Sequence, residues 1–470
     1  MGGIMLIRNA EIPGRGIADV RIAGGRIAAI GQLDVREGEA QIDGRGGALL
    51  PGLHDHHIHL AAAAVRAASI MCGPPEISTP AELSDRLSAA PGAGWLRGIG
   101  YHESVMGLPD AAMLDTLVPD RPLRIQHRSG RMWLFNTAAI QCLLAAAAPP
   151  PGMERDGGGY TGRLFDEDAW LQTALGSTPP DFAAVSAELA RCGVTGLTDM
   201  SPRNDAVMAA HFAEQAQSGA LRQRVMLAGT RSLAEAPRSP LWALGPAKLH
   251  LHENALPPFE DAAAFITSAH RQGRPVAVHC TTETELVFTL AALEAAGTLA
   301  GDRIEHAGIA PDHLVAEIAR LSLAVVSQPH FIAERGDRYL LDVAPALHPA
   351  LYRLQAFVAA GVTLAGGSDA PFGSLDPWAA MRAATTRATQ AGAIIGPDEA
   401  LSAQQALALY LTDPADLSRQ RTIEPGAPAD LCLLARPWAQ AREALTSAGV
   451  RATIAAGRII FDNGVDKAPA

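Results

Sequence analysis

The sequence predicts an α/β protein built on a closed (β/α)8 barrel, and three observations on the 470-residue chain lead to this fold class. From about residue 181 onward, short apolar segments alternate with helical segments, an order typical of a parallel sheet. Together with an apolar segment near residue 50, these strands number eight, which is the number that closes a barrel. Hydrophobic residues make up 48% of the chain, enough to fill a core of that size.

The expected strands follow one another along the chain, and predicted helices separate most of them. Several of these helices stop at a glycine, which is a common helix end. The strands are expected at residues 49–60, 194–199, 223–228, 247–252, 275–279, 303–306, 324–328 and 362–369, with helices at 181–192, 205–218 and 261–272.

The net charge indicates which kinds of partner the protein does not bind, and the cysteines indicate the cellular compartment in which it works. A formal net charge of −11 argues against a nucleic-acid or acidic-membrane partner, because phosphate groups bind basic surfaces. The 5 cysteines are dispersed and form no C-x-x-C pair, which indicates reduced thiols. The first residues show no secretory pattern, and the alanine-rich tracts are too short to span a bilayer. We therefore expect a cytoplasmic protein with no nucleic-acid or membrane partner.

Both ends of the chain show short strands separated by turns. Three strands precede residue 31, and Gly24-Gly25 between two of them is a hairpin signal. Similar strands follow residue 430. We expect residues 1–48 and 424–470 to form one small β domain beside a barrel domain of residues 49–423. Two separate β flaps are the alternative.

A long irregular stretch interrupts the barrel pattern after its first strand. It covers residues 61 to about 180 and contains Pro/Gly-rich breaks and short helical pieces. Such a length is unusual for a loop, so we expect an inserted lobe that covers the functional site.

Four histidines lie at the end of the first barrel strand. Side chains alternate along a strand, so His57 and His59 point to one face, whereas His54 and His56 fall out of phase with them. Two imidazoles on one rigid strand make half of a metal site. Solvated histidines at a polar strand end are the alternative interpretation.

Further candidate ligands lie where later strands end, which is where such barrels carry their chemistry. They are Lys248, His279, His306, Asp369 and, if the fourth strand stays regular, His250 and His252. The separations of 31 and 27 residues between the first three match one βα unit each, and the next separation, of 63, matches two. Several imidazoles and a carboxylate at one barrel mouth favour a transition metal, with zinc as the default.

The order of these motifs is similar to that of a known family. The matching pieces are Pro51-Gly52 with His57-x-His59, Gly193-Val194-Thr195, Lys248, Val278-His279, Arg303-Ile304-Glu305-His306, Ser327-Gln328-Pro329, Gly367-Ser368-Asp369-Ala370-Pro371 and residues 424–431. Over nearly its whole length the chain resembles the amidohydrolase superfamily. Within it, the resemblance is to the metal-dependent hydrolase branch (amidohydrolase family 3) that includes N-substituted formamide deformylase. This resemblance implies a TIM-like barrel, a β-sandwich formed by both termini and an inserted lobe.

The resemblance also implies a role for each ligand. The implied ligands are His57 and His59 at the more buried of two divalent ions, His279 and His306 at the other, Lys248 as a bridge and Asp369. Lys248 would carry a CO2-derived carbamate, whose oxygens bind cations that an ammonium group repels. Asp369 would act as general base and acid for a metal-bound hydroxide that attacks the scissile carbonyl. Without the resemblance, Lys248 is an ordinary strand-end cation and Asp369 a helix cap.

Four residues are candidate substrate contacts. Arg131 stands where the family usually has a histidine, which favours a carboxylate-bearing substrate held by a bidentate pair. Trp133 and Asn136 match the family in the lobe, although a tryptophan in such a position is more often a core residue. His330 follows the seventh strand and is the fourth candidate.

Other charged residues lie near the predicted ligands in the sequence or match acidic positions of the family. Arg303 and Glu305 are expected to turn away from the sixth-strand histidine as a structural ion pair. Glu283 replaces, in a shifted position, the acid that the family has after its fifth strand. Asp166 or Glu167 either reaches the metals from the lobe or belongs to an exposed acidic turn.

The leading hypothesis is a metal-dependent hydrolase of a small molecule. It would cleave a C–N bond in an amide, formamide, urea or cyclic amide. The nearest rival is a one-metal deaminase of an amino-substituted heterocycle, but this chemistry needs a glutamate three residues after His279, and Glu283 is four residues away. A catalytically silent barrel scaffold is a third alternative, which the complete ligand set disfavours. The resemblance also suggests a homodimer.

Overall fold

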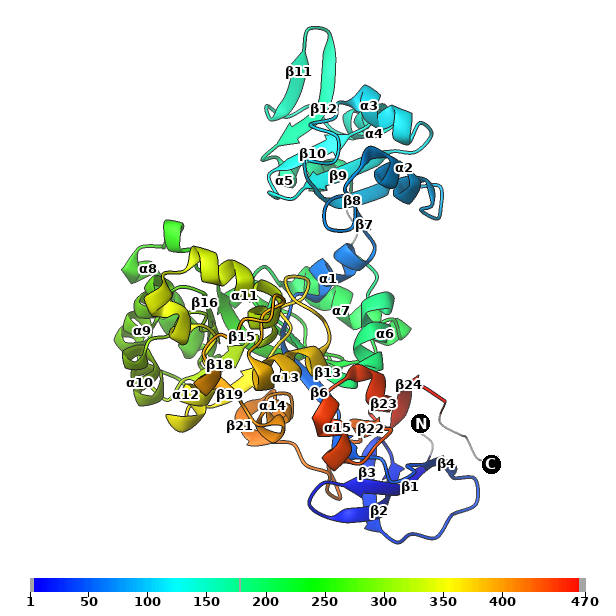
Figure 1. Cartoon of the computed structure of the whole chain (residues 1–470), viewed down its shortest axis with the longest axis vertical. Helices are drawn as coiled ribbons and strands as arrows, with labels where there is room; N and C mark the ends of the chain where they lie inside the picture. Colours follow the sequence, from blue (N-terminus) through cyan, green and yellow to red (C-terminus); the bar gives the residue numbers. More distant parts are fainter. Residues whose placement is uncertain (1–3, 177–178, 465–470) are drawn as a thin grey trace. The chain divides into compact units, whose positions relative to one another are not determined.

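Eight parallel strands form the central sheet of the structure, a computed structural model that describes residues 4–176 and 179–464. In the sheet order β19-β18-β17-β16-β15-β14-β13-β6, each strand lies beside its neighbour in the barrel sequence (Figure 1). Their bounds are β6 (Leu53–Ile58), β13 (Val194–Asp199), β14 (Arg224–Gly229), β15 (Ala243–Leu249), β16 (Val276–Cys280), β17 (Arg303–His306), β18 (Ala324–Ser327) and β19 (Leu364–Gly366). All eight expected strands overlap these, and the predicted α/β barrel is confirmed.

The chain closes the barrel just after β19. The backbone N–H of Asp369 donates to the carbonyl of His57 at 2.7 Å, and the N–H of His59 donates to the carbonyl of Ala370 at 2.9 Å. A Cβ on Gly367 would lie 2.6 Å from the backbone nitrogen of His57, so only glycine allows this approach. The closure therefore places the residues after β19 directly beside the histidine-rich end of β6.

Helices separate most of the barrel strands, as the alternating pattern predicts, and only the short 3-10 helix Arg231–Glu235 lies between β14 and β15. The helix after β16 begins at a capping box, in which Thr282 accepts from the N–H of Glu285 and the Glu285 side chain accepts from the N–H of Thr282. The helices around the barrel and near the C-terminal end of the chain are α1 (Leu60–Ala67), α6 (Ala183–Arg191), α7 (Ala206–Ser218), α8 (Phe259–Arg271), α9 (Glu283–Ala296), α10 (Asp312–Arg320), α11 (His330–Asp342), α12 (Gln355–Ala359), α13 (Pro377–Thr386), α14 (Ala403–Ala408) and α15 (Trp438–Ala444). A short hairpin, β20 (Thr412–Asp413) and β21 (Asp416–Gln420), follows α14.

The two ends of the chain supply two four-stranded sheets. One has the order β3-β2-β1-β4 and the other β24-β23-β22-β5. A single buried apolar cluster contains residues of both sheets, including Ile7 and Ile22 from the first and Leu431 and Ile454 from the second. The strands are β1 (Met5–Ile12), β2 (Gly16–Ala23), β3 (Arg26–Gly31), β4 (Ala40–Asp43), β5 (Leu49–Pro51), β22 (Leu431–Leu434), β23 (Val450–Ala455) and β24 (Arg458–Asp462).

Residues 64–180 form a compact unit of their own, which we call the lobe. Its six-stranded sheet has the order β11-β12-β10-β9-β8-β7, and two apolar clusters pack its helices against the strands. The strands are β7 (Ile70–Met71), β8 (Leu96–Tyr101), β9 (Leu123–His127), β10 (Met132–Phe135), β11 (Met153–Asp156) and β12 (Gly159–Phe165). The helices are α2 (Pro80–Ser88), α3 (Ala111–Leu117), α4 (Thr137–Ala146) and α5 (Asp168–Ala174).

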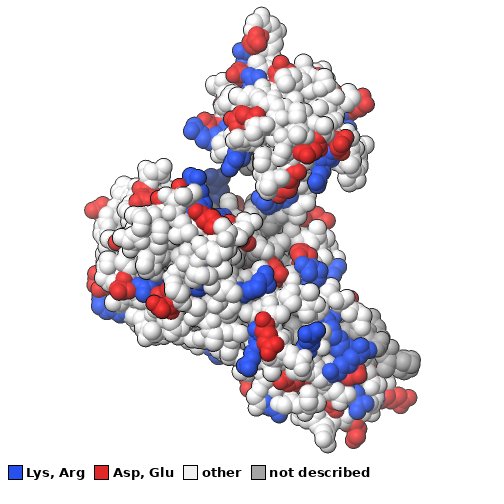
Figure 2. Space-filling view, in the orientation of Figure 1, with Lys and Arg blue, Asp and Glu red and all other residues white. Residues whose placement is uncertain are grey.

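The surface carries charges of both signs. On the face shown in Figure 2, basic and acidic side chains are interspersed over each part of the chain. Within residues 4–176 and 179–464, no helix is both long and apolar enough to cross a membrane.

Candidate metal centre

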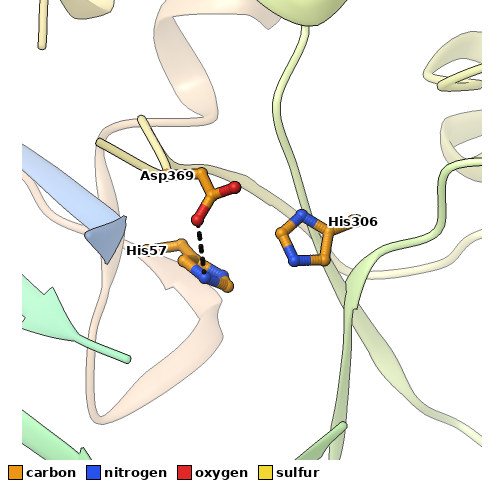
Figure 3. A group of neighbouring side chains, drawn as sticks. All are labelled: His57, His306 and Asp369. Atoms are coloured by element: carbon orange, nitrogen blue, oxygen red, sulfur yellow. Dashed lines mark ion pairs between the residues drawn. The ribbon is translucent and has the colours of Figure 1, made fainter. Parts of the chain in front are cut away.

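The carboxyl ends of the barrel strands bring His57, His306 and Asp369 together. One ligand atom of each lies within 4.8 Å of the others, and all three residues are buried (Figure 3). Asp369 Oδ1 lies 3.3 Å from Nε2 of His57 and 3.2 Å from Nε2 of His59. His57 lies on β6 and His59 just after it, His306 ends β17 and Asp369 lies after β19, so the folded barrel alone assembles them.

Two more of the predicted ligands lie at the same end of the barrel. The ring centroid of His279 is 4.5 Å from that of His306, which is in turn 4.8 Å from the ring of His57. Lys248 on β15 is only 4% exposed, and it lies close enough to affect the pKa of all three of these imidazoles. The structure therefore brings together all six residues that the sequence singled out, while their binding of metal stays a prediction.

Hydrogen bonds hold two of the imidazoles in one orientation. Nδ1 of His57 contacts the carboxylate of Glu305, and Nδ1 of His306 lies 2.7 Å from Oε1 of Gln328. A carboxylate or amide oxygen at Nδ1 accepts the proton there and leaves Nε2 as the free ligand atom. Both rings therefore present Nε2 for coordination.

The expected ion pair between Arg303 and Glu305 is present, but it does not turn away from the site. Nε of Arg303 donates to Oε1 of Glu305 at 2.6 Å, while the other carboxylate oxygen contacts His57. His306 has a φ of 71°, so the regular alternation of side chains does not continue to this residue. Glu305 therefore supports His57 from inside the barrel.

Burial disfavours the charged forms of several nitrogen-bearing side chains of the site. It lowers the pKa of His306 to about 3 and also lowers the pKa of His279. Burial likewise lowers the pKa of Lys248. A neutral imidazole offers its lone pair to a metal, and a neutral amine is the form that can add CO2.

Asp369 supplies the negative charge. Burial alone would raise the pKa of this carboxyl, but the imidazoles of His57 and His59 beside it hold the pKa well below its usual range. At His57, burial opposes the protonated form, yet the carboxylates of Glu305 and Asp369 raise its pKa above the ordinary value. The cluster therefore attracts positive charge to the space between His57 and Asp369.

This donor set fits a divalent transition metal. Nε2 of His57 is buried and, apart from its ion-pair contact with Asp369, has no partner among the described residues. Nζ of Lys248 is also buried and has no hydrogen-bond partner there. Buried polar atoms of this kind need a further partner. Imidazole nitrogens and carboxylate oxygens are the ligands that zinc and related ions take in proteins.

The remaining histidines near the site fall into two groups. His54 and His56 lie on the other face of β6, as predicted, where they contact the hydroxyls of Thr198 at 2.9 Å and Thr412 at 2.7 Å. The fourth strand was expected to continue to residue 252, but β15 ends at Leu249. His250 nevertheless lies near the site, with its ring centroid 4.4 Å from that of His279.

His330 is buried beside the segment that carries Asp369. Its Nε2 lies 2.9 Å from the carbonyl oxygen of Ser368, so Nε2–H donates to that carbonyl. Its Nδ1 is buried and has no partner among the described residues. His330 thus holds the residue before Asp369, and its predicted contact with substrate stays a prediction.

Within the lobe, Arg131 and Trp133 have defined partners. Nε and Nη2 of Arg131 donate to the two carboxylate oxygens of Asp166 at 2.8 and 2.7 Å, and both side chains are exposed. Trp133 is 5% exposed, and its indole N–H donates to Asp168 at 2.8 Å. Glu167 precedes α5 and accepts from the N–H of Gly152 at 3.1 Å.

Asn136 forms four hydrogen bonds inside the lobe and is fully buried. Its Oδ1 accepts from the N–H groups of Leu123 at 2.8 Å and Ala139 at 3.0 Å, the second of which caps α4. Its Nδ2 donates to the carbonyls of Val118 at 2.8 Å and Arg121 at 2.7 Å. This side chain therefore joins the start of α4 to the two segments beside it.

We expect Asn136→Ala to destabilise the protein by about 3 kcal/mol, because a helix cap is lost and buried partners are left unsatisfied. Urea unfolding followed by tryptophan fluorescence measures this change. Gln141→Ala, at an exposed position on the same helix, is the matched control and should leave the free energy of unfolding nearly unchanged. Equal stability of Asn136→Ala and the wild type would contradict the structural role.

A barrel with imidazoles and a carboxylate gathered at its strand ends is an arrangement that metal-dependent hydrolases use. The chain belongs to the amidohydrolase family, whose family model matches residues 40–461. It is a metal-dependent amidohydrolase, and the resemblance seen in the sequence is confirmed.

Individual relatives extend over nearly the same length. N-substituted formamide deformylase of Arthrobacter pascens is 27% identical over 492 residues, which cover 89% of this chain and 90% of the relative. An uncharacterized metal-dependent hydrolase from Pyrococcus horikoshii OT3 has a TM-score of 0.76 at 20% identity, covering 92% of this chain and 98% of its own. N-isopropylammelide isopropylaminohydrolase from Burkholderia multivorans ATCC 17616 has a TM-score of 0.57 at 18% identity, with coverage of 98% and 99%. These two solved structures share the fold.

Proposed function

We propose that the protein hydrolyses the C–N bond of a small amide, formamide, urea or cyclic amide with the help of two divalent metal ions. The observation that carries this proposal is the meeting of His57, His306 and Asp369 within 4.8 Å at the strand ends. The relationship to N-substituted formamide deformylase supports formamides and related amides as the first substrates to test.

We assign the ligands as follows: His57 and His59 to one metal, His279 and His306 to the other, Lys248 as a carbamate between them, and Asp369. Two facts support the carbamate. Burial lowers the pKa of Lys248, which favours the neutral amine, and its Nζ has no other partner among the described residues. Zinc is our first choice of metal because imidazole and carboxylate ligands suit it.

Bound metal ions would lower the pKa of a coordinated water and polarise the scissile carbonyl. In our proposal Asp369 takes a proton from the attacking water, because the pKa of its carboxyl is held well below the usual range and it is ionised at neutral pH. The same carboxyl then gives this proton to the leaving nitrogen as the C–N bond breaks. Glu305 keeps His57 in the orientation that this arrangement needs.

We also propose the domain boundaries of the chain, its cellular compartment and its oligomeric state. Residues 1–48 and 424–470 would form a β-sandwich domain, and residues 49–423 the hydrolase barrel with its lobe at about 61–180. One buried apolar cluster shared by the two terminal sheets supports the first assignment. A cytoplasmic homodimer stays a prediction, as do the substrate contacts of Arg131, Trp133, Asn136 and His330.

Metal content per chain tests the proposed centre. We expect close to two metal ions per wild-type chain when the protein is purified with bicarbonate and without chelator. Lys248→Ala should lower this value sharply, because the proposed bridge is lost. His313→Ala, at an exposed histidine, is the control and should leave the metal content unchanged.

The other outcomes separate the alternatives. One metal that persists in Lys248→Ala would favour the mononuclear deaminase. No metal under any condition would contradict both enzymes and return the silent scaffold to consideration. Activity of the two-metal protein on a panel of formamides, amides, ureas and cyclic amides would then identify the substrate class.

A further inference from the structure

Two arginines lie side by side on the sheet of the lobe. Arg97 on β8 and Arg124 on β9 are directly paired in the parallel register of these strands. Equivalent residues on neighbouring strands point to the same face, so the two guanidinium groups share one patch of surface. Both side chains are half-buried and therefore remain within reach of a ligand from solvent.

Neither arginine forms an ion pair with a carboxylate. The side chains of Arg97 and Arg124 make no hydrogen bond within the described ranges, the Nε atom of each is buried, and only the charge of Asp168 acts favourably on Arg97. Two other arginines of the lobe do have carboxylate partners: Arg131 is held by Asp166, and Arg163 by Glu154 at 2.9 Å. The paired strands therefore carry two neighbouring positive charges, neither of which is in an ion pair.

Tryptophan rings hold the two guanidinium groups in place. The central carbon of Arg97 lies 5.5 Å from the ring centroid of Trp133, and that of Arg124 lies 5.9 Å from the same ring and 5.8 Å from Trp95. Such cation–π contacts orient a guanidinium without using its N–H donors. The carboxylate of Asp168 accepts from the indole N–H of Trp133, and its charge partly offsets the effect of burial on Arg97 without forming an ion pair with it.

The arrangement is costly unless something negative binds to it. Burial lowers the pKa of Arg97, and burial together with the charge of Arg97 lowers the pKa of Arg124 to about 10. Both effects mean that the two positive charges are disfavoured where they stand. A bound oxyanion would remove the repulsion and satisfy the free N–H donors.

We propose that Arg97 and Arg124, stacked on Trp133 and Trp95, form a binding site in the lobe for an oxyanion, either a carboxylate or a phosphate group. Two adjacent guanidinium forks match the oxygens of such a group, and the aromatic rings beside them suit an organic molecule that bears it. The group belongs either to the substrate or to a separate small anion. This site does not depend on the metal centre.

Anion titration of the full-length protein tests the site. Inorganic phosphate and succinate are added in separate experiments, and binding is followed by calorimetry and by tryptophan fluorescence, since both rings contact the arginines. We expect saturable binding of at least one anion to the wild type. Arg97→Gln and Arg124→Gln should each weaken it by about tenfold or more, because charge-assisted bonds are lost.

Arg163→Gln is the matched control, because this lobe arginine is already paired with Glu154, and it should bind the anion like the wild type. Arg97→Lys and Arg124→Lys keep the charge and guard against misfolding, so they should retain weakened binding. Preference for phosphate would indicate a phosphorylated ligand, and preference for succinate a carboxylate. Absence of binding, or equal binding to the double variant R97Q/R124Q, would overturn the proposal.

Discussion

Replacing Asp369 with asparagine is expected to lower kcat by about 10²–10⁴-fold, the usual contribution of a positioned general acid or base. Asparagine preserves the size of the side chain and one oxygen, so the barrel around it should fold normally. The amide cannot take a proton from the attacking water or return one to the leaving nitrogen. The loss should therefore appear mainly in kcat.

Metal content must be measured on the same preparation, because Asp369 is also a proposed ligand. A large fall in kcat with both metals retained would support proton transfer, whereas parallel losses of metal and activity would assign only a ligand role. Asp342→Asn, an exposed carboxylate paired with Arg338, is the control and should change neither quantity. Unchanged kcat in Asp369→Asn would contradict the proposed mechanism.

The barrel could be predicted because its strands are short apolar runs, and predicted helices that end at glycines separate most of them. The fourth strand shows the limit of this approach. This strand was expected to begin at residue 247, which leaves out Gly245 and Pro246. In the structure both residues lie within β15, next to an irregularity in its pairing with β14. A proline is tolerated there because the regular ladder is already interrupted.

Most residues of the candidate metal centre could be predicted because they stand at the ends of expected barrel strands, whereas the role proposed for Lys248 came only from the family resemblance. What could not be predicted is the support around them. The contact of Glu305 with His57 joins residues 248 positions apart, and it depends on the backbone of His306 leaving the regular strand conformation. Alternation along a strand cannot reveal either fact.

The lobe was the least predictable part. Its strands are short and interrupted by glycines, so the sequence suggested only breaks and helical pieces. The pairing of Arg97 with Arg124 depends on the register between two strands, which the local pattern of basic and apolar residues does not specify. Long-range pairing of this kind requires the structure.

Glu305→Gln is the second substitution with a large expected effect. Although burial would raise the pKa of Glu305, Arg303 and His57 hold it well below the usual range, so the side chain is a carboxylate. Glutamine removes the charge that orients His57. Loss of such a partner typically costs about 10–100-fold in metal affinity or activity, and we expect a loss of this size here.

A stability effect must be separated from this functional one. Glu305 also neutralises the buried Arg303, and an arginine left without its partner destabilises a protein by about 3–5 kcal/mol. Glu399→Gln provides a matched control, because Glu399 is likewise buried and pairs with Arg353 at 2.7 Å. It should lower the stability without changing the metal affinity.

Competition with a chelator measures metal affinity, and denaturant unfolding of the same samples measures stability. If Glu305→Gln weakens metal binding while Glu399→Gln does not, the carboxylate acts through the orientation of His57. If both variants lose stability and neither loses metal affinity, Glu305 serves the fold alone. The first result would also explain why a charged pair is kept inside the barrel at this position: without it, the imidazole has no fixed direction in which to present Nε2.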